Sequence, residues 1–413
     1  MHDSFGNRVG CDSADALRAY DLGVDRQLHA WPGALEAHRE SLRHAPDFAL
    51  ARSAVALLLN SQGHGAAARV ALAMARASPA ALDAREQSHL ALTGHIVEGR
   101  TGAALDGVLE HARRWPTDAL AASTAVGAYG LIAFSGRADH DALRLEFVDA
   151  LAPHHAPEFA WLLANRGWAR IEAGRVEEGT AMALRSLALR PDNGHLAHIL
   201  MHAYFESDDP RAALAFIEGW LPGYPDHALM WGHLQWHAAL AEIALGRIDE
   251  AMQRLLGPIV DYLPRGVPFM GLIDITSLPW RLGLLGRSGL PWELARQHAQ
   301  RHFPNGSNPF GEVHLAMLAA ARRDSPALRR SRNRLQDQAD AGQAGATSAV
   351  QWIDGLLALM AQPLDADGVA RAAFDACLAQ CVRLGGSHAQ RSVIELSRSA
   401  MALPAAAMPA TPQ

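Results

Sequence analysis

The chain has 413 residues, of which 49% are hydrophobic and 19% are charged, and its formal net charge is −6. This composition is typical of a globular protein with enough apolar residues for a large core. The negative charge, with no Lys/Arg run and no interleaving of aromatic and basic residues, argues against a protein that binds nucleic acid.

The cysteines and the N-terminus indicate the compartment. Cys11, Cys377 and Cys381 are three in number and form no disulfide framework, which favours a reducing environment. The N-terminus lacks the positive and apolar regions of a signal peptide, and the apolar run at 55–59 is far too short to span a bilayer. The sequence therefore predicts a cytoplasmic protein that does not enter a membrane.

In chain order, the apolar residues recur at spacings of three and four almost throughout, which predicts helices and no strands. Two early stretches, 31–46 and 99–116, are expected to be second helices of helix pairs, each ending at a proline. The clearest repeats follow at 160–193, 194–227 and 232–264.

The stretch 161–191 resembles a tetratricopeptide unit. Gly167 and Gly179 stand where two helices need small residues to pack closely, and Gly174 stands in the turn between them. Pro191 closes the unit, and adding the 34-residue period of this repeat leads to Pro225.

A helical repeat of this kind buries its apolar face only by stacking on its neighbours. We therefore predict an all-α fold: an α-solenoid of tetratricopeptide-like antiparallel helix pairs, curled around an internal groove or pocket, as a single domain over 1–400. The polar, Gly/Ala-rich stretch 334–349 is expected to be a loop or a frayed helix end, and 401–413 a disordered tail.

Histidine is unusually frequent, with 21 copies, and its positions in the repeats are informative. In the tetratricopeptide consensus, positions 2, 5 and 9 of the first helix face the concave groove. In three successive units these positions are Trp161, Ala164 and Trp168; His195, His198 and His202; and His233, Trp236 and Leu240, with His237 beside them.

Two histidine pairs have the spacing of metal ligands. His198 and His202 lie four residues apart, as do His233 and His237, so each pair shares a helix face. Because packed helices lie about 8–10 Å apart, the four rings are candidate ligands of one divalent transition metal. Neither pair has the glutamate of the HExxH motif, which disfavours a zinc peptidase. The alternative is that these are hydrogen-bonded packing residues.

Five stretches together resemble the tetratricopeptide repeat protein 38 family: HILMH (198–202), HLQWH (233–237), IDITSLPWRLGLLG (273–286), 309–321 and LGGSHAQRSVIE (384–395). The resemblance covers about residues 99–400 and implies a single α-solenoid with a closed, inward-facing polar site. The family's motif positions fall on His198, His202, His233, Trp236, His237, Asp274, Trp280, His314, Gly386, His388, Gln390 and Arg391. The sequence departs from the family pattern at Phe205, Pro279 and Ser392.

The last two motifs also have local interpretations. Gly385 and Gly386 can end a helix and Ser387 can cap the next one, which would place His388 and Arg391 near free backbone N–H groups that suit an anion. The alternative is a plain helix connection. Asp274 lies in an apolar run, so its carboxylate needs a histidine, an arginine, a metal or a neighbouring hydroxyl as partner.

Two functions are compatible with these patterns. One is a scaffold that holds a peptide or protein segment in an open groove through tryptophans, with exposed histidines and no metal. The other is an enzyme or receptor with an enclosed small-molecule or metal site, in which His202, His237, Asp274 and His388 are catalytic. Its ligand contacts are His198, His233, Trp236, Trp168, Trp280, His314, Gln390 and Arg391. The histidine content favours the second, and an Ala/Leu-rich surface is compatible with a homodimer.

Overall fold

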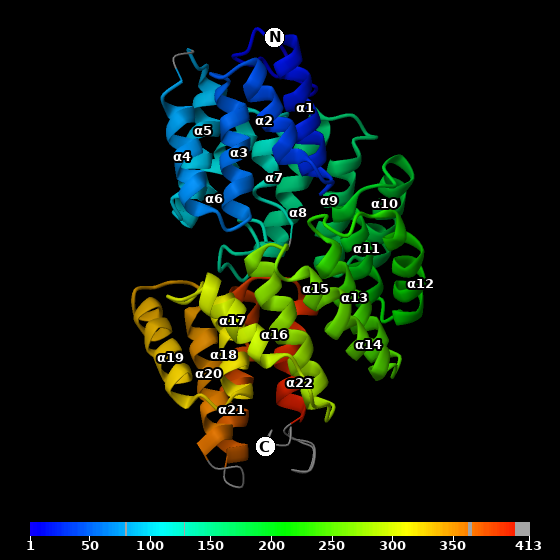
Figure 1. Ribbon diagram of the computed structural model, residues 1–413, viewed down its shortest axis with the longest axis vertical. Coiled ribbons are helices and arrows are strands. Elements are labelled where there is room, and N and C mark those ends of the chain that lie inside the picture. The colour runs from blue at the N-terminus through cyan, green and yellow to red at the C-terminus, as the bar shows by residue number, and fades with distance from the viewer. Residues whose placement is uncertain (79–80, 128, 362–365, 401–413) are drawn as a thin grey trace. The chain divides into compact units, whose positions relative to one another are not determined.

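The computed structural model describes residues 1–78, 81–127, 129–361 and 366–400 (Figure 1). Within these ranges the regular structure is helical, apart from an isolated antiparallel bridge between His2 and Arg8. The predicted all-α class is confirmed. Among the described residues, no helix is both long enough and apolar enough to cross a membrane. The predicted tail 401–413 lies outside the described residues.

The chain divides into two compact units, which we describe separately. The first comprises Met1–Ser135, Asp141–Ser207 and Glu218–Trp231, and the second comprises Gly136–His140, Asp208–Ile217 and Gly232–Gln413. The helices of the first unit are α1 (Ala14–Leu28), α2 (Ala34–His44), α3 (Ala49–Ser61), α4 (Gly65–Arg76), α5 (Ala84–Val97), α6 (Thr101–Arg114), α7 (Ala119–Ser123), α8 (His140–Leu151, except for its first residue), α9 (Ala160–Glu172), α10 (Val176–Leu189) and α11 (Gly194–Glu206).

The second unit consists mostly of the C-terminal part of the chain, from Gly232 onward. Its helices are α13 (Trp231–Ala244, except for its first residue), α14 (Ile248–Arg254), α15 (Val260–Tyr262), α16 (Pro268–Leu284), α17 (Trp292–His302), α18 (Pro309–Ala321), α19 (Ser325–Asp340), α20 (Ala346–Ala361), α21 (Ala366–Leu378) and α22 (His388–Ala400). The division falls within α12 (Pro210–Trp220).

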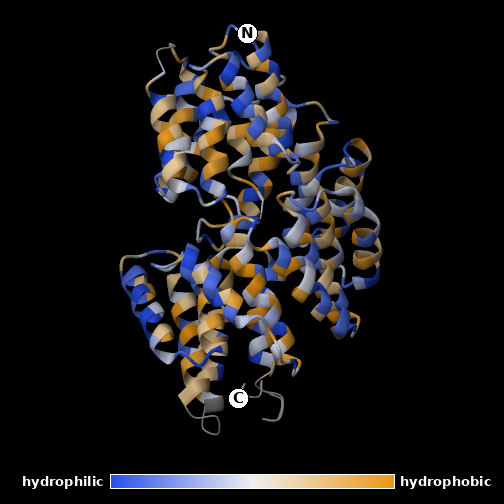
Figure 2. Ribbon diagram, in the orientation of Figure 1, coloured by the Kyte–Doolittle hydropathy of each residue, from blue (hydrophilic) through white to orange (hydrophobic). Residues whose placement is uncertain are grey.

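The helices of each unit pack mainly against their sequence neighbours, as α1 does against α2, α9 against α10 and α20 against α21. This is the packing of an all-α solenoid. Hydrophobic and hydrophilic residues alternate around most helices (Figure 2), as expected where one face of a helix is buried and the other is hydrated. That the whole of 1–400 forms a single domain stays a prediction.

The helix pairs occur where the sequence predicted them. The stretch 31–46 contains α2 and 99–116 contains α6, while 160–193 contains α9 and α10. The expectation for 334–349 was wrong: α19 continues to Asp340 and α20 begins at Ala346, so only five residues connect them. Leu335 and Ala349 are fully buried, and this burial stabilises helix in a stretch that has a polar composition.

The crossing of α9 and α10 requires two glycines. A Cβ atom on Gly167 would lie 2.8 Å from the carbonyl oxygen of Gly179, and a Cβ atom on Gly179 would lie 2.5 Å from that of Gly167. The turn between the helices contains Gly174 with φ at +80°, a conformation that glycine adopts without strain. The three glycines that indicated the repeat thus have the packing and turn roles that were predicted for them.

Candidate functional site

The predicted site residues are distributed over both units. Trp168, His198 and His202 belong to the first unit, and all the others belong to the second. The proposed set of four metal ligands draws one histidine pair from each unit and stays a prediction. Each pair is described here within its own unit.

In the first unit, His198 and His202 lie on α11 and are buried. Their Nε2 atoms are 3.0 Å apart, so one ring donates a hydrogen bond to the other. The ring of Trp168 on α9 lies 4.6 Å from that of His202, and Glu172 Oε1 lies 3.6 Å from His202 Nδ1. The three predicted residues of this unit therefore come together, with a carboxylate that the sequence analysis did not single out.

In the second unit, a histidine–aspartate pair links α13 to α16. His233 Nδ1 lies 2.8 Å from Asp274 Oδ1, and both side chains are buried. Burial raises the pKa of Asp274, and the His233 ring opposes that rise. The partner of this carboxylate is thus a histidine and not a neighbouring hydroxyl, because Thr276 Oγ1 donates to the carbonyl oxygen of Leu272.

Trp236 is the centre of an aromatic group on α13. Its ring stacks on that of His233 at 5.2 Å and 10°, and the edge of His237 approaches it at 4.9 Å. The indole Nε1 donates a hydrogen bond of 3.0 Å to Ser277 Oγ on α16. Asp274 and Ser277 are three residues apart and so face α13 together.

Arg281, four residues after Ser277, continues this stripe along α16. Its Nη2 donates to the carbonyl oxygen of Ala389 at 2.7 Å and to Ser392 Oγ at 3.0 Å. Its guanidinium lies 5.8 Å from the Trp236 ring. The side chain is 4% exposed, and among the described residues no carboxylate pairs with it and no acceptor faces Nη1. Burial lowers the pKa of Arg281 to about 9.

The predicted helix start at Ser387 is present. Gln390 N donates to Ser387 Oγ at 3.3 Å and Ser387 N donates to Gln390 Oε1 at 3.0 Å, which together form a capping box. Arg391 Nη1 donates to the carbonyl oxygen of Gly386 at 2.6 Å. The Arg391 side chain is therefore hydrogen-bonded to the loop, and the Gln390 side chain is hydrogen-bonded in the cap of α22.

Helix α18 places His314 close to Arg281. A Cβ atom on Gly386 would lie 2.7 Å from the Phe310 ring, so the glycine allows α18 to approach the start of α22. His314 Nδ1 lies 2.9 Å from the carbonyl oxygen of Phe310. Burial lowers the pKa of His314 to about 4, with a smaller contribution from the charge of Arg281. His314 is therefore a neutral imidazole close to a buried cation.

Two predicted residues lie apart from this set. His388 is exposed on the first turn of α22. Trp280 is half-buried and donates from Nε1 to Ser397 Oγ at 2.8 Å, which joins α16 to α22. Pro279 lies inside α16 without ending it. The departure from the family pattern at this position therefore leaves the helix continuous.

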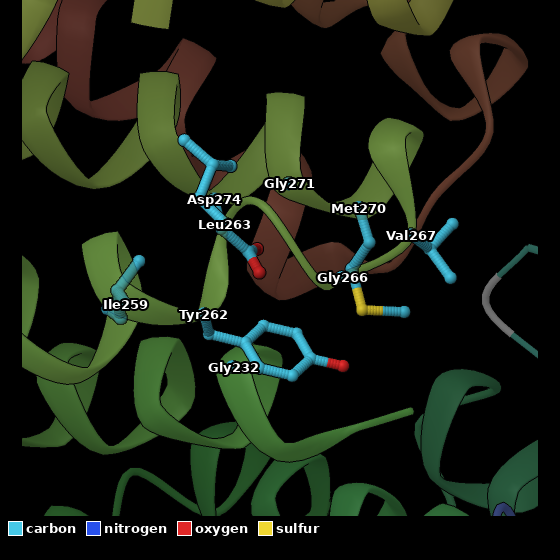
Figure 3. A pocket seen from close by; sticks show the side chains of 9 residues that line it. All are labelled: Gly232, Ile259, Tyr262, Leu263, Gly266, Val267, Met270, Gly271 and Asp274. Carbon is cyan, nitrogen blue, oxygen red and sulfur yellow. The ribbon is translucent and has the colours of Figure 1, made fainter. Parts of the chain in front are cut away.

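A small pocket lies beside Asp274 (Figure 3). It is lined by residues of α15 and α16 and of the segments before these two helices. Its lining is mostly apolar and includes Tyr262, Met270 and Leu263, and the Asp274 carboxylate points toward the Tyr262 ring. The free volume is about 10 Å³, the space of roughly one water molecule. The pocket therefore admits solvent to the carboxylate but has no room for an organic ligand.

The first unit contains a second buried polar cluster that sequence analysis missed. His89 Nδ1 lies 3.0 Å and His111 Nε2 lies 3.2 Å from Asp118 Oδ2. These two rings and one carboxylate have the spacing of metal ligands, but Arg85 Nη1 donates to the same oxygen at 2.5 Å. Burial acts to raise the pKa of Asp118, yet the two histidines and Arg85 outweigh it and hold that pKa well below its usual range. The cluster already has a counter-ion, so we regard it as structural.

Arg281 is the functional candidate that the sequence analysis did not single out. The available signal was one basic residue in the otherwise apolar run 273–286, the same argument that drew attention to Asp274. No protein-family model matches the chain.

Proposed function

We propose that the second unit binds a small organic anion at Arg281, and that the His233–Asp274 pair acts on this ligand as an acid/base group. In this proposal the protein is a tetratricopeptide-type solenoid of the kind found in the tetratricopeptide repeat protein 38 family. It works in the cytoplasm, in agreement with three cysteines that are all free thiols.

The buried guanidinium of Arg281 is the observation that carries the proposal. A charged group away from water is costly unless a counter-ion or hydrogen bonds compensate it. Nη2 has two acceptors, but Nη1 has none among the described residues and no carboxylate balances the charge. A carboxylate or phosphate of a ligand would supply both, because these groups match the fork of a guanidinium.

The neighbours of Arg281 suit such a ligand. His314 is neutral and can donate or accept a hydrogen bond without adding another charge. The Trp236 face lies against the guanidinium and separates it from the His233 ring by one aromatic layer. Arg281, Ser277 and Asp274 lie along one face of α16, so an anion at Arg281 would lie on the same helix face as the acid/base pair, with Trp236 between them.

The His233–Asp274 contact supports a chemical role. A carboxylate at Nδ1 fixes the proton on that nitrogen and orients the ring, so Nε2 has the lone pair that can accept a proton. The same arrangement orients histidine bases in enzymes. Burial of the Asp274 carboxylate keeps this electrostatic interaction strong.

The alternative of a peptide scaffold expects an open groove with exposed histidines and tryptophans. His233, Trp236 and His237 are all buried, as are Trp161 and Trp168 in the first unit. Burial of these anchors disfavours an open peptide groove lined by them. A divalent transition metal on the paired histidines is a further prediction, which elemental analysis of the purified protein tests directly.

The decisive experiment compares anion binding by the wild type and the variant Arg281→Gln. Thermal unfolding is measured with acetate, succinate, inorganic phosphate and glycerol phosphate, and native mass spectra are searched for anions that copurify. The control is Arg247→Gln in the same unit, because Arg247 is exposed and the side chain of its partner Glu250 is 44% exposed as well. We expect at least one anion to stabilise the wild type and Arg247→Gln but not Arg281→Gln.

Two outcomes contradict the proposal. One is an equal response of the wild type and Arg281→Gln to every anion that binds. The other is a wild type that copurifies with no anion and is stabilised by none of the four. A metal that is stoichiometric in the wild type and lost in His237→Ala would instead support the metal prediction.

A further inference from the structure

An open groove lies on the second unit between α17, α18 and α19, away from the residues of the proposed anion site. Its volume is about 280 Å³, far larger than the pocket beside Asp274. The groove is lined by residues of all three helices and of the turn after α17. It is therefore a surface feature of size sufficient for several side chains of a partner.

Apolar side chains form part of the groove lining. Ala299 of α17 and Phe303, the residue just after α17, line the groove. Leu315, Ala316 and Ala319 line it from α18. Apart from Phe303 these are small or aliphatic side chains. Ala299, Ala316 and Ala319 are buried, so Phe303 and Leu315 supply most of the exposed apolar surface of this set. Water on such a surface is displaced favourably by apolar side chains.

Four arginines and one aspartate, Asp324, also line the groove. Arg296 and Arg322 share Glu293, and Arg334 pairs with Glu312. Arg330 is exposed and makes no ion pair with any residue that the structure describes. Six arginines and one aspartate occur between 322 and 334 in a chain whose net charge is −6, and Figure 2 shows hydrophilic residues along most of α19. Of these six arginines, Arg322, Arg330 and Arg334 line the groove.

We propose that this groove binds an acidic amphipathic helix of a partner protein. An amphipathic helix lays its apolar face into a hydrophobic groove and places its charged residues at the two edges. Here the apolar part of the lining would receive aliphatic side chains, and Arg330 with Arg322 and Arg334 would contact glutamates along the edges of the helix. Complementary charge of this kind increases the association rate and selects the partner. The interaction is separate from the anion site and does not depend on it.

The lining favours a peptide over a nucleic acid. Proteins that bind single strands place exposed aromatic rings where bases can stack. Among the described residues that line the groove, Phe303 is the only aromatic one, and it is half-buried. The positions that would need stacking platforms are occupied by alanine and leucine, which match aliphatic side chains.

The test uses fluorescence anisotropy with the full chain and a synthetic peptide. The peptide is about 15 residues long, the length at which an isolated helix begins to form, with leucines at spacings of three and four and glutamates elsewhere. A peptide of the same composition in scrambled order separates helix recognition from charge alone. A single-stranded oligonucleotide of similar net charge is the competing ligand.

The key variants are Arg330→Glu and its neighbour Arg329→Glu. Both arginines are exposed on α19, and the charge change is identical, but only Arg330 lines the groove. We expect Arg330→Glu to weaken binding of the amphipathic peptide by about ten-fold or more, and Arg329→Glu by less than about three-fold, because rim charges act mainly through local contacts in salt. Arg281→Gln should bind the peptide as the wild type does.

Four results would overturn the inference. The first is no binding of the amphipathic peptide at low salt. The second is equal weakening by Arg330→Glu and Arg329→Glu, which would mean diffuse attraction. The third is equal binding of the scrambled peptide, and the fourth is tighter binding of the oligonucleotide. Far-UV circular dichroism of both variants confirms that these surface changes leave the helices intact.

Discussion

Replacing a buried arginine by glutamine should have opposite consequences at two places in this protein. Arg281 has no carboxylate partner among the described residues, whereas Arg85 pairs with the buried carboxylate of Asp118. We expect Arg281→Gln to leave the anion-free protein at least as stable as the wild type. We expect Arg85→Gln to destabilise it strongly.

The magnitudes follow from the two environments. Burial lowers the pKa of Arg281 to about 9, and since one pKa unit corresponds to about 1.4 kcal/mol, the buried charge costs on the order of 4 to 5 kcal/mol. The hydrogen bonds to Ala389 and Ser392 return about 0.5–1.5 kcal/mol each. Their loss leaves a net gain of about 1–4 kcal/mol for Arg281→Gln. Removal of Arg85 leaves Asp118 buried without its cation, which costs about 3–5 kcal/mol.

Urea unfolding followed by far-UV circular dichroism measures both effects, with separate transitions for the two units if they unfold independently. The samples are dialysed without phosphate or carboxylate buffers, because a bound anion would stabilise the wild type alone. A loss of more than about 2 kcal/mol in Arg281→Gln would refute the reasoning. It would mean that the guanidinium is fully compensated within the folded chain.

Three further predictions concern packing, capping and pH. Gly179→Ala should lower the free energy of unfolding by about 1–2 kcal/mol, since overpacking exceeds the gain in helix propensity. Gly107→Ala in α6 should raise it by about 0.5–1 kcal/mol, because the added Cβ would meet only atoms at 3.9 Å or more. Equal effects of the two variants in urea titrations would contradict the crossing geometry. Ser387→Ala removes the cap of α22 and should cost about 1 kcal/mol, and an unchanged unfolding midpoint would show that the cap is redundant. Burial lowers the pKa of His38 from 6.5 to about 3, so between these pH values the unfolded chain takes up a proton at this residue and the folded chain does not. The contribution of His38 to the free energy of unfolding should therefore decrease as the pH drops from 6.5 to 3. His38→Met should flatten that part of a stability-against-pH curve, and a curve parallel to that of the wild type would contradict the prediction.

The sequence alone was sufficient for the features that depend on near neighbours. Periodicity of three and four gave the helices, and Gly167, Gly174 and Gly179 gave a helix pair with a close crossing, because both signals act within about thirty residues. Ser387 indicated the start of α22 through a cap that involves the next turn only. The error at 334–349 arose because composition alone was weighed there, without the burial of Leu335.

Tertiary structure decided which side chains meet. His233 and Asp274 are 41 residues apart, and only the packing of α13 on α16 makes them a pair. The sequence indicated that Asp274 is a buried charge that needs a partner, but the residues near it in the sequence did not indicate that the partner is His233. The packing around α16 gives Arg281 no carboxylate partner among the described residues, whereas in the first unit the start of α7 brings Asp118 to Arg85 on α5. Sequence patterns report the period and polarity of a helix face, whereas the charge balance of a buried group depends on every element that packs against it.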